Sequence, residues 1–146
     1  DGATGKVLKK FSAHGERPTN VHHDAKGNRL FVANQTSENI TVLDAKTGAL
    51  IKAIPTAAGA LGVNYDPQRD RIYVANRHGR TVNVIDGTSL EIIKTFEIGA
   101  LPNTVAINHQ TGDVYVTNKE AVRERGENAP EPVPAPNADS VSLIKL

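Results

Sequence analysis

The residues best suited to metal or acid–base chemistry are five histidines, at positions 14, 22, 23, 78 and 109. His22 and His23 are adjacent in a strand-like segment, so their side chains point to opposite faces and cannot supply two metal ligands from one strand. The other three lie in separate loops, and the chain has no cysteine that could add a thiolate. We therefore expect no metal site and no cofactor.

The aspartates could take part in acid–base catalysis, but they recur at a fixed interval. Asp24 is followed 42 residues later by Asp66, and Asp44 is followed in the same way by Asp86. A carboxylate repeated in successive units is more typical of a turn that it caps than of a single catalytic site. No nucleophile stands beside a base in the sequence, so we predict no catalytic residues and a protein that is not an enzyme.

The interval of 42 residues extends well beyond the aspartates. Three strand-like hexapeptides, each with an aromatic residue third and Asn last, occur at 29–34, 71–76 and 113–118. Each unit of 42 residues can be divided into four short strands, and four strands per ~40–50 residues are typical of a β-propeller blade. The alternative, a β-sandwich, requires no identical units at a fixed interval. The sequence therefore predicts an all-β fold, a β-propeller of four-stranded antiparallel blades.

The second strands of the first two units are continuously apolar at 30–33 and 72–75, which indicates strands covered on both faces by neighbouring blades. The aromatic residues in the second strands are therefore expected in the core. They are Phe31, Tyr73 and Tyr115. The asparagines that end the same strands are expected to have a structural role at the following turn, because Asn side chains bond to nearby backbone groups. They are Asn34, Asn76 and Asn118.

The repeat divides the chain into about three blades. Residues 1–14 are expected to form the last strand of a preceding blade, 15–56 and 57–98 two complete blades, and 99–146 a last blade. The last blade contains an insertion at 119–139, whose alternating prolines predict an extended or mobile loop. This division predicts twelve strands and almost no helix.

The repeated tetrapeptides FVAN (31–34), YVAN (73–76) and YVTN (115–118) resemble the signature of the YVTN-repeat β-propeller family. The resemblance covers nearly the whole chain except the insertion. It implies a seven-bladed ring, a periplasmic location and an association with single-stranded DNA. The same propeller also occurs in surface-layer proteins, lactonase-like hydrolases and subunits of periplasmic dehydrogenases, so the resemblance is specific for fold and poor for activity.

A ligand of a propeller usually binds where the loops after the second and fourth strands surround the central channel. Those loops carry cationic side chains, and the innermost strands add polar side chains at the channel wall. Together these tentative ligand-binding residues are Arg17, Arg77, His78, Arg80, Asn20, His22 and Asn64. They predict a binding face for single-stranded DNA or a protein partner, with a lactonase-like hydrolase or dehydrogenase subunit as the alternative functions. The simpler interpretation is a solvated loop surface.

The overall composition excludes few functions. A formal charge of +1 gives no electrostatic reason to expect nucleic acid as a partner, and no apolar run approaches the ~20 residues of a membrane span. The 146 residues contain no methionine, which indicates that residue 1 is not a translation start. Since three blades are too few to close a ring of at least about four, we expect other polypeptide to complete it. The remaining blades of the same protein would give seven blades, and a second chain would give six.

Overall fold

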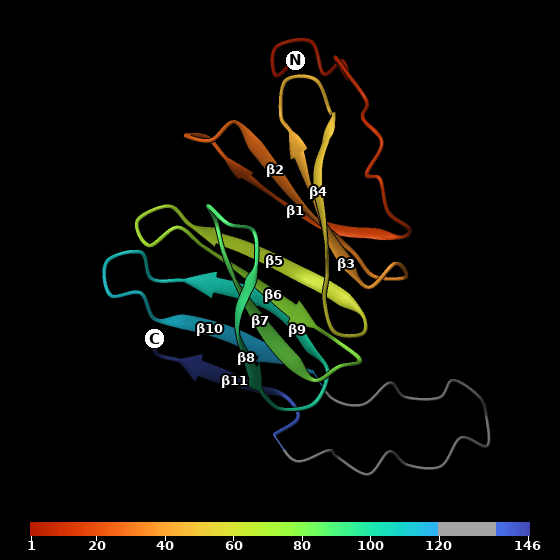
Figure 1. Cartoon of the computed structure of the whole chain (residues 1–146). Helices are drawn as coiled ribbons and strands as arrows, with labels where there is room; N and C mark the ends of the chain where they lie inside the picture. The colour runs from red at the N-terminus through yellow and green to blue at the C-terminus, as the bar shows by residue number, and fades with distance from the viewer. Residues whose placement is uncertain (120–136) are drawn as a thin grey trace, which may run out of the picture.

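The strands of the repeat form as expected in a computed structural model, which describes residues 1–119 and 137–146 (Figure 1). Eleven strands occur in this described part of the chain, and no helix does. The strands are β1 (Pro18–Asp24), β2 (Arg29–Asn34), β3 (Asn39–Asp44), β4 (Leu50–Pro55), β5 (Ala60–Asp66), β6 (Arg71–Asn76), β7 (Thr81–Asp86), β8 (Ile92–Glu97), β9 (Pro102–Ile107), β10 (Val114–Asn118) and β11 (Ser140–Ile144).

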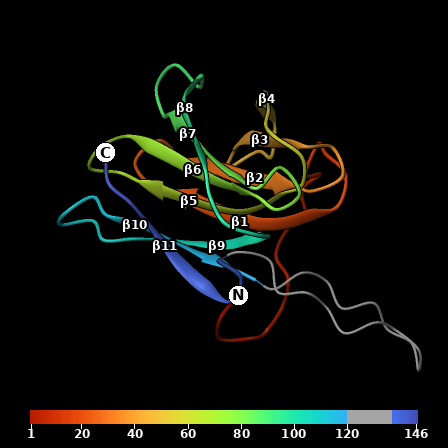
Figure 2. The same ribbon diagram turned by 90° about the horizontal axis from the view of Figure 1, so that it is seen from below.

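The strands form three antiparallel sheets in sequence order, which we call blade 1 (β1–β4), blade 2 (β5–β8) and blade 3 (β9–β11). Each blade is a meander in which every strand pairs with the next. The blades follow one another face to face, with the first strand of each beside the first strand of the next (Figures 1 and 2). The fold is therefore all-β and that of a partial β-propeller, as the repeat predicts.

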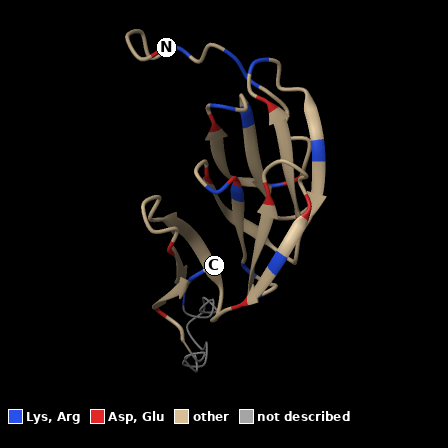
Figure 3. Cartoon of the chain, turned by 60° about the vertical axis from the view of Figure 1, so that its left-hand side comes forward, with Lys and Arg blue, Asp and Glu red and all other residues tan. Residues whose placement is uncertain are grey.

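Two apolar clusters hold the blades together. The first joins blade 1 to blade 2 and contains Phe31 and Ile72, and the second joins blade 2 to blade 3 and contains Tyr73 and Val116. Successive side chains of a strand point to opposite faces, so Ile72 and Tyr73 of β6 enter different clusters. Both faces of blade 2 are covered in this way, which explains the absence of polar alternation in β6. Charged residues lie mainly in turns and near strand ends (Figure 3).

The repeated asparagines and aspartates have the structural roles that the sequence predicts. Asn76 Nδ2 donates to Thr81 Oγ1 and Asn83 Oδ1 of β7, at 3.1 and 2.7 Å. Asn34 and Asn118 bond to side chains of β3 and β11 at the equivalent positions. These asparagines thus join the second strand to the third, rather than only closing a turn.

The repeated aspartates accept hydrogen bonds from backbone amides in their own turns. Asp24 accepts from the amide of Gly27, and Asp66 accepts from that of Gln68. Asp44 and Asp86 do the same in the turns between third and fourth strands.

Two expectations about the ends of the repeat are wrong. Residues 1–14 hold no strand, because a fourth strand gains its backbone hydrogen bonds from a third strand and no described strand pairs with this segment. Tyr115 is 38% exposed, whereas Phe31 and Tyr73 are fully buried. The reason is that no described blade covers the face of blade 3 to which Tyr115 belongs.

Most of the expected insertion, residues 120–136, lies outside the described residues. In the part of the chain that the structure describes, no helix is long and apolar enough to cross a membrane.

Candidate functional site

The loops that the sequence assigned to a binding face do lie together at one end of the sheets, which we call the loop end. Gln35 N donates to Arg17 O at 3.0 Å, and Arg77 N donates to Gly59 O at 2.8 Å. In blades 1 and 2 the loop after the second strand is therefore bonded to the loop that precedes the first strand. This pairing brings Arg17 and the segment 77–80 to the same end of the molecule.

The cations at the loop end differ in their availability. Arg77 is half-buried and donates to Asn103 Oδ1 in blade 3 at 3.2 Å, so part of its guanidinium is used between blades. Arg17, His78 and Arg80 are exposed. Arg17 and Arg80 have φ values of 53° and 56°, in the left-handed region that side chains other than glycine seldom adopt.

The three polar residues predicted on the innermost strands are not brought together. Asn20 is exposed on β1 near the loop end. Asn64 Nδ2 donates to Val105 O at 3.0 Å, so this amide joins β5 to β9. His22 lies toward the opposite end of β1, which carries the turns between first and second strands and which we call the turn end.

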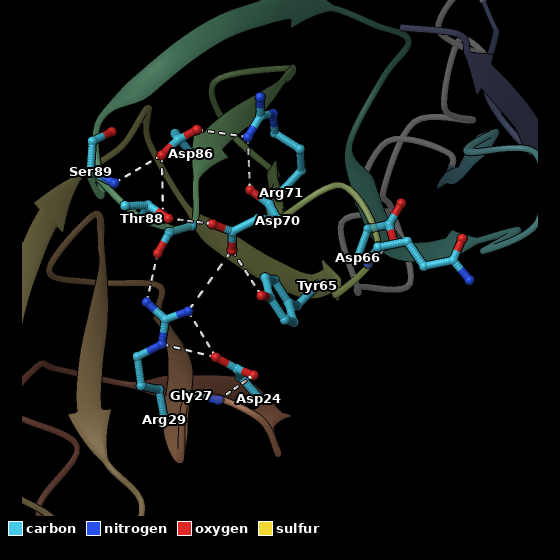
Figure 4. Close-up of polar contacts among 12 residues, drawn as sticks. Asp24, Gly27, Arg29, Tyr65, Asp66, Asp70, Arg71, Asp86, Thr88 and Ser89 are labelled. Carbon is cyan, nitrogen blue, oxygen red and sulfur yellow. Dashed lines mark hydrogen bonds and ion pairs between the residues drawn. The ribbon is translucent and has the colours of Figure 1, made fainter.

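At the turn end, Arg29 connects the first two blades (Figure 4). Its Nε and Nη2 donate to Asp24 Oδ2 at 2.9 and 2.8 Å, and its Nη1 donates to Gly87 O in blade 2 at 2.6 Å. Burial alone would raise the pKa of Asp24, but the hydrogen bonds from Gly27 and Arg29 outweigh it and hold that pKa below its usual value. Asp24 therefore stays ionised at neutral pH.

Asp70 extends this network within blade 2 (Figure 4). The Tyr65 hydroxyl donates to Asp70 Oδ1 at 2.8 Å, and Thr88 Oγ1 donates to Asp70 Oδ2 at 2.7 Å. Burial, followed by the hydrogen bond to Asp70, raises the pKa of Tyr65 to about 12. Tyr65 is consequently a neutral hydrogen-bond donor at every physiological pH.

Asp66 is hydrogen-bonded within blade 2 and lies close to blade 3. Its carboxylate is fully buried, and it accepts from Arg69 Nη1 at 3.0 Å and from Gln68 N at 3.0 Å. Nδ1 of His109, which follows β9, lies 3.5 Å from Asp66 Oδ1. Burial would raise the pKa of Asp66, but hydrogen bonds from Arg69, Gln68 and His109 lower it overall. An ionised buried carboxylate is thus held beside an imidazole that is 47% exposed.

The His109 imidazole faces a pocket of about 270 Å³ at the turn end. All three blades contribute to it, and its lining consists of His22, His23, Asp24, Ala25, Lys26, Tyr65, Pro67 and His109. Burial lowers the pKa of His22, and the nearby His109 and His23 lower it further. A second pocket of about 430 Å³ shares Asp24, Lys26, Tyr65 and Pro67 with the first. The two pockets are therefore adjacent at the turn end.

The described residues contain no group of three or more His, Cys, Asp or Glu that could hold a metal ion. The sequence interpretation included His22 but missed Asp66 and His109 as site residues. A usable signal was present, since Asp24, Asp66 and Asn108 are equivalent turn positions, and the blades place these turns side by side.

The family model for arylesterases matches residues 46–125, which is more than half of the 146-residue chain. The chain belongs to the arylesterase family. Asp66 and His109 both lie inside the matched span. A comparison with curated proteins gives no match to this member of the arylesterase family.

Solved structures similar to this arylesterase-family chain include several propellers. Hydrazine synthase from Kuenenia stuttgartiensis has a TM-score of 0.67 and 22% identity, covering 80% of this chain and 32% of that chain. The β-propeller domain of Cps50 (Swd1) from Myceliophteria thermophila has a TM-score of 0.62 and 14% identity over 73% of this chain and 34% of that chain.

The WD40 β-propeller domain of Doa1 has a TM-score of 0.65 and 18% identity over 76% of this chain and 37% of that chain. At such identities the likeness concerns the fold alone. The chain spans about a third of the length of these structures.

Proposed function

We propose that this chain is part of an ester hydrolase in which His109 activates water at the turn end. The observation that carries the proposal is the pairing of a buried, ionised carboxylate with an exposed imidazole that faces a pocket. A base that is oriented by a third group is the usual arrangement for proton transfer in hydrolysis. Membership of the arylesterase family supports an ester as the substrate.

The chemistry follows from the two nitrogens of His109. Since Nδ1 faces Asp66, the proton on Nδ1 is directed to the carboxylate and Nε2 is left as the base toward the pocket. Nε2 takes a proton from a water molecule whose oxygen attacks the ester carbonyl carbon. The tetrahedral intermediate then breaks its bond to the alcohol oxygen, which leaves with the proton from the imidazolium. The products are a carboxylic acid and an alcohol, and Asp66 stabilises the imidazolium without being protonated.

Other pocket residues fit the substrate class. Ala25, Tyr65 and Pro67 provide apolar contact for an aromatic or acyl group, and the exposed Lys26 provides positive charge near a developing oxyanion. The lowered pKa of His22 favours its neutral form, so a second imidazole adds hydrogen-bonding capacity without a fixed positive charge.

Hydrolysis of phenyl acetate tests the proposal. His109→Gln removes the base but keeps a polar side chain of similar size, and we expect kcat/KM to fall by a factor of about 10²–10⁴. His78→Gln is the matched control, because it removes an exposed imidazole at the loop end and should leave kcat/KM unchanged. The proposal would be refuted if the His109 variant and the parent chain had equal activity, or if neither hydrolysed phenyl acetate faster than the buffer does.

A second candidate function is binding of an anionic strand at the loop end, as the likeness to periplasmic YVTN-repeat propellers implies. Its specific support is that three side chains able to carry positive charge are exposed at the loop end, namely Arg17, His78 and Arg80. Binding through phosphates releases counterions, so the affinity should fall steeply as salt is raised.

The ligand for that test is an oligo-dT strand. Arg17→Ala with Arg80→Ala should reduce both the affinity and its salt dependence, whereas Lys52→Ala, in β4, should change neither. Unchanged binding by the double variant would exclude the loop end. A periplasmic location is part of the same proposal, and fractionation of cells that express the protein tests it.

A further inference from the structure

Arg69 connects the carboxylate and the imidazole of the candidate base at the turn end. It lies in the turn between β5 and β6, and its Nη1 donates to Asp66 Oδ2 at 3.0 Å. The same nitrogen donates to the backbone oxygen of His109 at 3.2 Å, and Nη2 donates to that of Gln110 at 3.4 Å. One guanidinium of blade 2 is therefore bonded both to the buried carboxylate and to the backbone of blade 3 that carries the imidazole.

The turn that carries His109 has the shape that this guanidinium needs. Gly112 N closes the turn by donating to Asn108 O at 2.7 Å. Gly112 has a φ of 85°, in the region that favours glycine, and a Cβ atom there would lie 2.5 Å from Arg69 Nε and 2.6 Å from Arg69 Cζ. A larger residue at this position would therefore push the guanidinium away from the two backbone oxygens.

Arg69 and His109 are both departures from the repeat. The turns between first and second strands are equivalent in the three blades, because they begin with Asp24, Asp66 and Asn108 at intervals of 42 residues. The residues that replace Arg69 and His109 in the equivalent turns are Gly27, Thr111, Ala25 and Pro67. A residue needed only to form the turn would recur, as the capping side chains do. The two residues that do not recur are bonded to each other, which indicates a role specific to this pair of turns.

The buried carboxylate of blade 1 is held in a different way. Asp24 is paired with Arg29 of β2, whose other bond goes to Gly87 O at 2.6 Å. Arg71, the equivalent of Arg29 in blade 2, instead pairs with a carboxylate of β7. Asp66 thus receives its positive partner from a turn position that also places the guanidinium against the first turn of blade 3.

We propose that Arg69 is a positioning residue for the base at the turn end. It fixes the backbone of His109 relative to the Asp66 carboxylate, so that Nδ1 remains directed to Asp66 and Nε2 to the pocket. While Oδ2 of Asp66 is bonded to the guanidinium, Oδ1 faces Nδ1 at 3.5 Å. This role rests on the proposed function, because an imidazole that transfers no proton needs no fixed orientation.

Arg69 acts through His109 and not on the substrate. Among the described residues, it is not one that lines either turn-end pocket. Loss of its bonds should therefore lower kcat and leave KM unchanged, since the substrate keeps its contacts while the base loses its alignment. A misplacement of about 1 Å can cost about 10²-fold in rate, so for Arg69→Ala we expect kcat for phenyl acetate to fall by a factor of about 10–10².

Two further variants separate alignment from charge and from folding. Arg69→Lys keeps a positive charge beside Asp66, but an ammonium group lacks the planar fork that reaches a carboxylate and two backbone oxygens together, so kcat should fall here too. Arg71→Ala is the matched control, because Arg71 also forms an ion pair in blade 2, with Asp86 Oδ2 at 2.6 Å. Its bonds stay within blade 2, so this variant should keep the parental kcat.

A free guanidinium ion provides a test of rescue. The Arg69 side chain is 35% exposed, so a small cation can reach the space that Arg69→Ala leaves. Guanidinium chloride, well below the concentrations that unfold proteins, should restore part of the kcat of Arg69→Ala. Sodium chloride at the same ionic strength should not, because it offers no fork of N–H donors.

The mobility of the turn gives a readout that needs no activity. Order parameters from ¹⁵N relaxation should be about 0.85 for the amides of residues 109–111 in the parent chain and below about 0.6 in Arg69→Ala. Parental kcat in Arg69→Ala, an equal loss of kcat in Arg71→Ala, or order parameters unchanged by Arg69→Ala would each overturn the role of Arg69 while leaving hydrolysis at the turn end intact. No hydrolysis by the parent chain would instead refute the proposed function, and with it the part that Arg69 plays in it.

Discussion

The three tyrosines of this chain allow a stability prediction in which three chemically identical changes give three different results. The Tyr73 hydroxyl is buried between blades 2 and 3 and has no hydrogen-bond partner among the described residues. The Tyr65 hydroxyl donates to Asp70 Oδ1 at 2.8 Å. Tyr115 is 38% exposed. Replacement of each by phenylalanine removes one hydroxyl and almost no apolar surface.

The magnitude follows from what each hydroxyl loses on folding. A buried polar group without a partner costs about 1–3 kcal/mol of desolvation, so Tyr73→Phe should raise the free energy of unfolding by about 1 kcal/mol. The repeat supports this change, because Phe31 is fully buried at the equivalent position in blade 1. Tyr65→Phe should lower the free energy of unfolding by about 1 kcal/mol, since it removes a bond to a carboxylate that is partly open to solvent. Tyr115→Phe should change it by less than about 0.5 kcal/mol.

Thermal unfolding followed by circular dichroism measures the three effects. A change of 1 kcal/mol shifts the midpoint of a chain of this size by about 2–4 °C, so the midpoint should rise for the Tyr73 variant and fall for the Tyr65 variant. A lower midpoint for Tyr73→Phe would refute the reasoning, because it would mean that the hydroxyl has a partner in the folded protein.

Two further changes probe the contacts between blades. A Cβ atom at Gly62 would lie 2.3 Å from the backbone oxygen of Asn103, so Gly62→Ala should separate β5 from β9 and lower the free energy of unfolding by about 1–3 kcal/mol. Gly2→Ala is the control and should have little effect, because a Cβ atom there meets no other atom within 4 Å. Equal midpoints of thermal unfolding for the two variants would contradict the packing of these strands. The pKa values of Asp24 and Asp66 lie below the ordinary value of 3.8 in the folded state, so their stabilisation is present above that value and is lost as the pH falls through their folded pKa values. Acid titration should therefore show Asp24→Asn to be less stable than the parent chain at pH 7 and less sensitive to acid, and parallel pH profiles would contradict this assignment.

The sequence predicts the architecture well because the fold repeats. The hexapeptides ending at Asn34, Asn76 and Asn118 place one buried strand in each blade, and the blade order follows from their spacing. Tyr115 and residues 1–14 escape the prediction for one reason. Their burial or pairing depends on a neighbouring blade. The residue pattern is the same whether or not that blade is among the described residues, so the pattern alone cannot show that the contact is made.

The candidate functional site is harder to predict because its residues come from different blades. Asp66 and His109 are 43 positions apart, and each is unremarkable in its own turn. They meet because the turn ends of adjacent blades lie side by side. Arg77 and Asn64 illustrate the converse, since their types indicate ligand binding but one side-chain nitrogen of each is used in a bond to blade 3, Arg77 Nη1 to Asn103 and Asn64 Nδ2 to Val105.

The most direct test of hydrolysis at the turn end is a crystal structure of the protein with phenyl methylphosphonate. This compound is a stable mimic of the tetrahedral intermediate of ester hydrolysis, and such mimics bind more tightly than substrates. We predict that a phosphonyl oxygen lies within hydrogen-bond distance of His109 Nε2, with the phenyl ring near Tyr65 and Pro67. A phosphonate bound at the loop end beside Arg17 or Arg80, with the turn-end pocket empty, would contradict the account.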